Sequence, residues 1–101
     1  MGVLSLTDIL DDLRIAEEGL HKFERRYWIS SEQFFQLYEE GVLDDGEHLE
    51  DFAEWAGHYR LHEKRRESLG QISRKRLADL RRQAGNRPIQ LTPAEPVLEL
   101  R

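Results

Sequence analysis

Residues 27–59 read YWISSEQFFQLYEEGVLDDGEHLEDFAEWAGHY, and this stretch decides the fold. Together with Phe23, it holds every aromatic residue of the 101-residue chain. Because aromatic side chains bury the most area per residue, we expect the core to form here. The rest of the chain consists of two long charged segments and a tail that contains all three prolines.

The motif ISSEQF at residues 29–34 carries the start signal of a helix. Ser30 can accept a hydrogen bond from the backbone N–H of Gln33, whose side chain can return one, which forms a capping box. Gly41 suits the left-handed conformation that ends many helices. The sequence therefore predicts a short helix over residues 31–40.

An apolar heptad pattern precedes this short helix. Its members alternate at spacings of three and four residues: Leu6, Ile9, Leu13, Ala16, Leu20, Phe23 and Tyr27. Such a seam predicts a helix from Thr7 to Tyr27 that packs along a partner helix. Ser5 or Thr7 can cap it, and Gly19 is either a weak point or a place of close approach.

A second long helix is predicted from about Glu47, capped by Asp44 or Asp45. Its apolar face comprises Leu49, Phe52, Ala53, Ala56 and Tyr59, widened by Trp55. The apolar stripe then fades and resumes at Leu77, Leu80 and Ala84. We expect a kink or break at Gly70 and a further helix over residues 71–84. A continuous helix that runs past its partner, or a polar segment that meets another chain, are the alternatives.

Gly85 and Pro88 end helical structure, since proline cannot continue a helix. In the tail, residues 89–92 and 97–100 alternate apolar and polar side chains, as short strands do. The predicted fold is therefore all-α. Residues 1–87 form a helical domain, an antiparallel hairpin with a short cross-piece and a further C-terminal helix, and residues 88–101 form an extended, proline-bearing tail.

The charge of the chain is unevenly distributed. Residues 1–57 hold fifteen acids against four bases, whereas residues 58–87 hold ten bases against three acids. Such asymmetry is typical of an interaction face, or of an acidic half that pairs with the basic half of a neighbouring copy. We expect a homodimer, and its self-association residues are taken from the apolar seam: Leu6, Ile9, Leu13 and Leu20.

Catalysis has little support in the sequence. The chain has no cysteine and no phosphate-binding, dinucleotide-binding or nucleophile motif, so we expect no enzymatic activity and no cofactor. The best metal candidate is Glu54, His58 and His62, spaced four apart, with His48 or His21 as a further ligand. A solvated helix face explains the same pattern, and no metal site is predicted.

Two segments are candidates for binding a macromolecule. A basic stretch could contact nucleic-acid phosphates through Arg74, Lys75, Arg76, Arg81 and Arg82, although it has no aromatic residue that could stack on a base. The tail could instead dock on a partner protein through its aliphatic residues, which are Ile89, Leu91, Val97, Leu98 and Leu100. No apolar run is long enough to cross a bilayer and no signal peptide is recognised, so we expect a cytoplasmic protein without membrane contact.

Part of the chain resembles a known pattern. Its residues are Phe23, Glu24, Tyr27, Ser30, Ser31, Glu32, Phe34, Glu40, Gly41, Asp51, Phe52, Glu54, Trp55, Ala56, Gly57 and Tyr59. They resemble small helical antitoxin-side proteins of bacterial and archaeal toxin–antitoxin modules, over about residues 20–62. Those proteins have glycine where this chain has Trp28. The resemblance implies a non-enzymatic regulatory module that binds a partner protein, such as a toxin, and binding of nucleic acid through residues 60–87 is the alternative.

Overall fold

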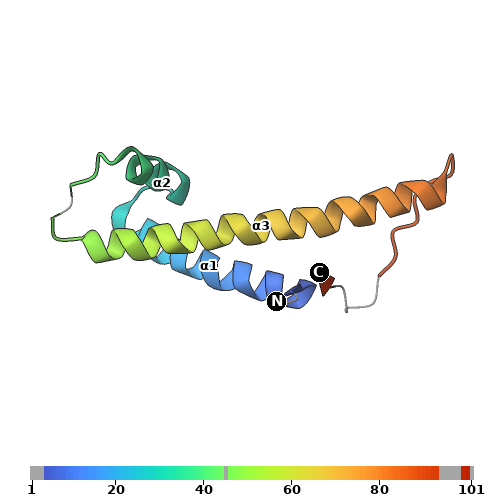
Figure 1. The fold of residues 1–101 in the computed structure, drawn as a ribbon, viewed down its shortest axis with the longest axis horizontal. Helices are drawn as coiled ribbons and strands as arrows, with labels where there is room; N and C mark the ends of the chain where they lie inside the picture. Colours follow the sequence, from blue (N-terminus) through green and yellow to red (C-terminus); the bar gives the residue numbers. More distant parts are fainter. Residues whose placement is uncertain (1–3, 45, 94–98, 101) are drawn as a thin grey trace.

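The structure is a computed structural model, and it describes residues 4–44, 46–93 and 99–100. Its elements in chain order are β1 (Leu4–Ser5), α1 (Leu6–Tyr27), α2 (Ser31–Glu40), α3 (Leu49–Ala84) and β2 (Glu99–Leu100). Figure 1 shows α1 and α3 running antiparallel, with α2 near the start of α3. The all-α class and the helical hairpin with its cross-piece are confirmed.

The start of α1 shows which predicted cap is used. Ser5 Oγ accepts a hydrogen bond from the Asp8 backbone N–H at 3.1 Å, and the Asp8 carboxylate accepts one from the Ser5 N–H at 3.4 Å. The predicted heptad seam points at α3 of the same chain, and its central members are buried. The proposed self-association residues Ile9, Leu13 and Leu20 are thus buried within one chain, and Leu6 is half-buried.

The predicted boundaries of α2 are confirmed. Ser30 Oγ accepts a hydrogen bond from the Gln33 backbone N–H at 3.1 Å, and Gly41 adopts a left-handed φ of 69° at the other end. Both signals act through backbone groups within a few residues, which is why the sequence alone locates them.

The predicted break at Gly70 is wrong. Helix α3 is continuous over 36 residues, so the expected further C-terminal helix is the last part of α3. A single glycine costs a helix about 1 kcal/mol, which its neighbours can offset. The Arg74 guanidinium contacts the Glu67 carboxylate across Gly70 at 3.1 Å. The start also differs, since His48 is at the N-cap position and makes no side-chain cap.

Helix α3 is much longer than α1. At 1.5 Å per residue, α1 is about 33 Å long and α3 about 54 Å. Arg65 of α3 contacts Asp12 of α1 at 2.6 Å, so the first turn of α1 lies opposite residues near position 71. Residues 73–87 therefore extend past α1, and we call them the arm (Figure 1).

The tail turns back along the arm after Gly85. The Arg76 guanidinium donates a hydrogen bond to the Thr92 carbonyl at 2.8 Å. Further on, β2 pairs antiparallel with β1, with Leu100 opposite Leu4 and Glu99 opposite Ser5. Residues 89–92 are not in a strand, which corrects one predicted strand, and residues 97 and 98 of the other lie outside the described residues.

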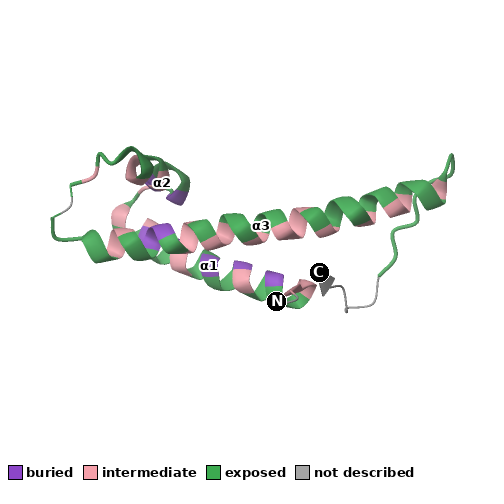
Figure 2. Ribbon diagram, in the orientation of Figure 1, coloured by how far each residue is buried: buried purple, intermediate pink, exposed green. Residues whose placement is uncertain are grey.

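The core lies where the three helices meet (Figure 2). Trp55 is 1% exposed, and its ring is parallel to that of Phe34 at 3.8 Å between centroids and stacked on Phe23 at 5.6 Å. Trp55 is therefore the centre of the apolar face of α3, whereas Leu49 and Ala53, which were expected on that face, are exposed.

Two glycines inside helices give a matched test of this packing. A Cβ atom on Gly19 would lie 2.6 Å from the His58 ring, whereas one on Gly57 would meet nothing within 4 Å. We expect Gly57→Ala to raise the free energy of unfolding by up to about 1 kcal/mol through helix propensity. Gly19→Ala has the same propensity gain but should lower that free energy, because the His58 ring or the helix that carries it must shift.

Urea unfolding followed by circular dichroism measures both variants. Stabilisation by both substitutions would contradict the close approach of α1 to α3 at Gly19.

Candidate partner-binding surfaces

The histidines do not form a metal site in the described part of the chain. His58 Nε2 lies 3.5 Å from the Glu54 carboxylate, but His62 turns toward Glu17 of α1, at 3.6 Å. His21 bonds Glu24, and His48 packs edge-on against Tyr27. Among the residues described, no group of three or more acids or histidines could hold a metal ion. His58 and His62 instead contribute to the packing of α3 on α1.

A buried polar network joins the three helices. Ser31 donates its backbone N–H and its hydroxyl to the Glu24 carboxylate, at 3.0 and 2.7 Å. Trp55 Nε1–H in turn donates to Ser31 Oγ at 2.8 Å. Burial acts to raise the pKa of Glu24, but the bonds from Ser31 and His21 outweigh it and lower that pKa below its usual value. Each group in this network is satisfied by another, as a structural network requires.

Trp28 is exposed at the turn between α1 and α2. It is the only non-glycine residue with positive φ among those described, at 61°, and its exposed fraction is 91%. A left-handed conformation costs an ordinary residue about 1–2 kcal/mol. The sequence signal for this site was the tryptophan at a position where glycine suits a helix end, and sequence reasoning did not use it to predict a binding surface.

Trp28 belongs to an acidic part of the molecule that we call the closed end, residues 28–57. This segment holds nine acids and no lysine or arginine. Three of the acids, Glu54, Asp51 and Glu39, pair with bases from outside the segment, which are Lys22, Arg26 and Arg60. Val42 and Leu49 are also large exposed apolar side chains there. The closed end therefore combines negative charge with apolar side chains that the described chain leaves uncovered.

The five predicted nucleic-acid-binding residues do not form one free surface. Arg74 is paired with Glu67, Arg76 binds the Thr92 carbonyl, and Arg82 contacts Asp79. Consecutive helical residues differ by about 100° in direction, so the run at 74–76 spreads around the helix. Lys75 and Arg81 are exposed and form no ion pair with a described residue.

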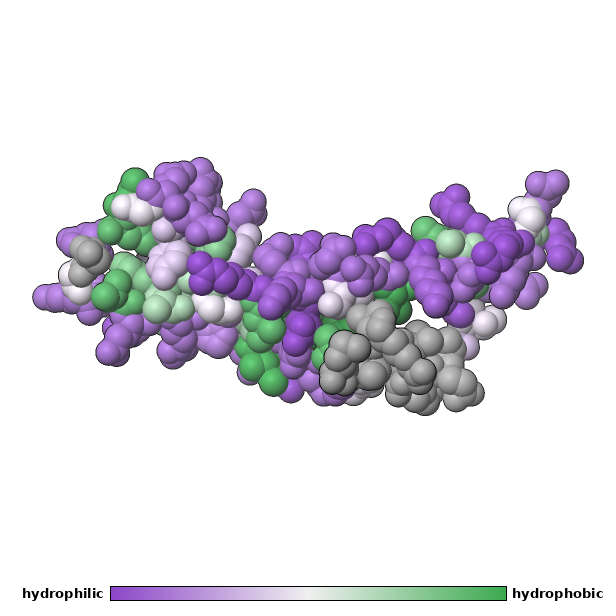
Figure 3. Space-filling view, in the orientation of Figure 1, coloured by the Kyte–Doolittle hydropathy of each residue, from purple (hydrophilic) through white to green (hydrophobic). Residues whose placement is uncertain are grey.

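The tail places its apolar side chains outward. Pro88, Gln90 and Thr92 line a hollow of about 450 Å³ together with the end of α3. The alternate residues, Ile89 and Leu91, are 45% and 77% exposed. Leu100 lies in β2, and Val97 and Leu98 are outside the described residues. The face of the molecule that Figure 3 shows is mainly hydrophilic, with scattered apolar areas.

Comparisons with known proteins give no relative of this chain: no protein-family model, no curated protein sequence and no solved structure matches it. None of the described helices is both long and apolar enough to span a membrane.

Replacement of Ser31 by alanine tests the buried network. Ser31→Ala leaves Trp55 Nε1–H without its acceptor and removes a donor to Glu24, so we expect a loss of about 1–3 kcal/mol in the free energy of unfolding. Ser68→Ala is the matched control, because the Ser68 hydroxyl bonds only the Lys64 carbonyl of its own helix. An equal effect of both substitutions would contradict a special role for Ser31.

The same variants predict a pH dependence. The folded-state pKa of Glu24 is lowered, so its contribution to stability is present above the unfolded-state pKa and is lost as pH falls through the folded-state value. Urea titrations of wild type and Ser31→Ala from neutral to acidic pH should therefore give curves that converge as pH falls. A constant difference would show that the bonds to Glu24 do not lower its pKa.

Proposed function

We propose that this protein is a non-enzymatic regulatory module that binds and neutralises a partner protein in the cytoplasm, in the manner of an antitoxin. The observation that carries the proposal is the outward direction of Ile89 and Leu91 on an extended tail. These two exposed aliphatic side chains stand at alternate positions of one segment, the spacing at which an extended peptide presents side chains to a partner. Their exposure is what a segment made for a second surface requires.

The conformation of the tail suits docking on a sheet edge. Residues 89–92 lie outside any strand, so their backbone groups are available to a partner strand, except for the Thr92 carbonyl, which accepts a hydrogen bond from Arg76. The chain already pairs part of this tail, since β2 forms an antiparallel ladder with β1. Burial of each aliphatic side chain on a partner would contribute about 1.5–3 kcal/mol before ordering costs.

The turn at Trp28 supports the resemblance to antitoxin-side proteins. Those proteins have glycine at this position, and glycine is the residue that most readily adopts positive φ. Trp28 adopts a φ of 61°, so this position of the chain has the backbone conformation that favours glycine.

Binding of nucleic acid through the arm is the second candidate function. It is favoured by Lys75 and Arg81, which are exposed and have no ion-pair partner among the described residues. It is disfavoured by the contacts that occupy Arg74, Arg76 and Arg82. Salt distinguishes the two functions, because binding to phosphates weakens steeply as salt rises, whereas apolar docking changes little.

An affinity pull-down from the native host tests the proposal. Full-length protein should retain a partner protein that a version ending at Arg87 loses, and Ile89→Ser/Leu91→Ser should lose it too. The control is Gln90→Ser/Thr92→Ser, which alters two residues that line the hollow beside the end of α3 and should keep the partner.

Two outcomes would contradict the proposal. If full-length and truncated protein retain the same partners, the tail does not dock. If only nucleic acid is retained, and charge reversal at Arg74, Lys75 and Arg76 removes it, the protein is a nucleic-acid-binding protein.

A further inference from the structure

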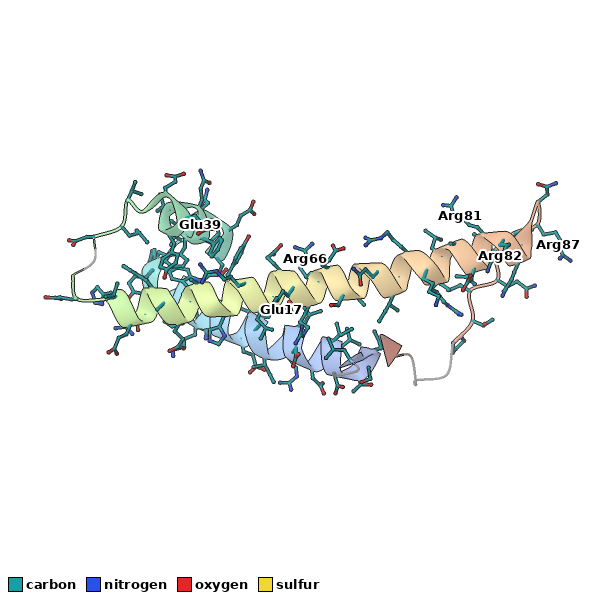
Figure 4. All side chains as sticks on the ribbon, viewed as in Figure 1. Glu17, Glu39, Arg66, Arg81, Arg82 and Arg87 are labelled. Atoms are coloured by element: carbon teal, nitrogen blue, oxygen red, sulfur yellow. The ribbon has the colours of Figure 1, made fainter. Side chains whose placement is uncertain are left out.

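The two ends of the molecule carry opposite charge. The principal extents are 58 × 30 × 23 Å, so the molecule is rod-shaped. The closed end holds nine acids and no lysine or arginine, whereas the arm at the far end holds six bases and one acid. Figure 4 shows this separation, with Glu39 near one end and Arg81, Arg82 and Arg87 near the other. The charges at the two ends lie too far apart to neutralise each other within one chain.

Each end also has exposed apolar side chains. The closed end has Trp28, Val42 and Leu49, and the arm has Leu77. On the arm, Leu77 lies between Arg74 and Arg81 on one helical face, because residues three and four apart are neighbours. Each end therefore pairs apolar area with charge of one sign.

We infer that two copies of this chain associate antiparallel, so that the closed end of each covers the arm of the other. The occupant of the apolar surface at each end is thus a second copy, and charge complementarity is the reason. A parallel pair would place one acid-rich closed end beside the other. A two-fold antiparallel pair forms the same acid–base contact twice, as an isologous interface requires.

Trp28 is the anchor of this contact. Arg60 already lies over the Phe35 ring at 5.3 Å, and Arg26 over Tyr27 at 5.7 Å, so arginine–aromatic contacts recur in this fold. Tryptophan is the best ring for such a contact. In the antiparallel pair, Trp28 packs on the face of the partner's arm that carries leucine and arginine. This contact explains why Trp28 has a left-handed backbone conformation and an exposed indole ring in the single chain.

This arrangement does not rest on the proposed function, because it needs no foreign partner. It also differs from a dimer through the heptad seam of α1, since α3 of the same chain fills that seam. Nucleic acid on the arm, or a foreign basic protein on the closed end, would occupy the same surfaces.

Complementary charge reversal tests the inference on the full chain. The first variant is Arg81→Glu/Arg87→Glu in the arm, and the second is Glu40→Lys/Glu47→Lys in the closed end. All four side chains are exposed. Each variant alone places like charges together in both contacts and should sediment near the monomer mass of 12.0 kDa. An equimolar mixture restores both contacts and should return to about twice that mass, the closed two-fold dimer.

A third variant controls for net charge. Arg14→Glu/Lys64→Glu changes the charge as much as the arm variant does but leaves the arm, Trp28 and the acids of the closed end intact, and it should still dimerise. For wild type, we expect the dissociation constant to rise at least about tenfold between 50 and 500 mM salt, because exposed charges are screened.

Trp28→Gly separates stability from association. Glycine relieves the positive φ, so the Tm of the monomer should rise, while dimerisation should weaken at least about tenfold through loss of the anchor. A structural role alone would leave association unchanged. Wild type that is monomeric at low salt and about 100 μM, a mixture that stays monomeric, or a control as weak as the arm variant would each overturn the inference.

Discussion

The contacts of the Trp55 indole connect all three helices. Its ring lies on Phe34 of α2 at 3.8 Å and on Phe23 of α1 at 5.6 Å, and its N–H donates to Ser31 at the start of α2. Helix α2 has only ten residues, and isolated helices of that length are not stable in water. Its position therefore depends on tertiary contacts, chiefly those with Trp55, the hydrogen bonds from Ser31 to the Glu24 carboxylate and the stacking of Phe35 on Tyr59 at 4.6 Å.

Stabilising contacts decrease along the rod from the closed end to the arm. Near Trp55 the helices share an aromatic cluster, and farther along they are joined by polar pairs such as Asp12 with Arg65. Beyond α1, the helical state of the arm depends on residue propensity, on local pairs such as Asp79 with Arg82, and on the tail that lies beside it. This gradient gives one packed end and one end whose surface is available to another molecule.

The decrease in stabilising contacts along the rod also indicates which residues are available to bind another molecule. Glu24, His21 and Ser31 lie in the packed part and bond to one another, so they are engaged in structure. Among the described residues, the exposed side chains without partners include large apolar ones, such as Trp28 and Leu91, and charged ones of both signs, such as Arg81 and Glu47. A surface of this kind favours recognition of a macromolecule, with the closed end, the arm and the tail as three separate contact areas.

The sequence by itself determined the elements that short-range interactions control. The heptad seam, the Ser30 cap and the Gly41 turn involve residues within one or two helical turns, so pattern and propensity locate them. Only the tertiary structure decided that α3 passes through Gly70 without a break, since a penalty of about 1 kcal/mol is small beside the contacts around it. It also decided that Trp55 rather than Leu49 faces the core, because the direction of that face depends on how α2 crosses α3.

For the candidate sites, the tertiary structure separated residues that spacing had grouped. His58 and His62 are four residues apart, but they contact carboxylates on different helices. His58 lies beside Glu54 of α3, and His62 lies beside Glu17 of α1. The apolar seam assigned to self-association is filled by α3, because an intrachain partner is always present at high effective concentration. The outward direction of Ile89 and the exposure of Trp28 likewise depend on contacts distant in sequence, which no local pattern encodes.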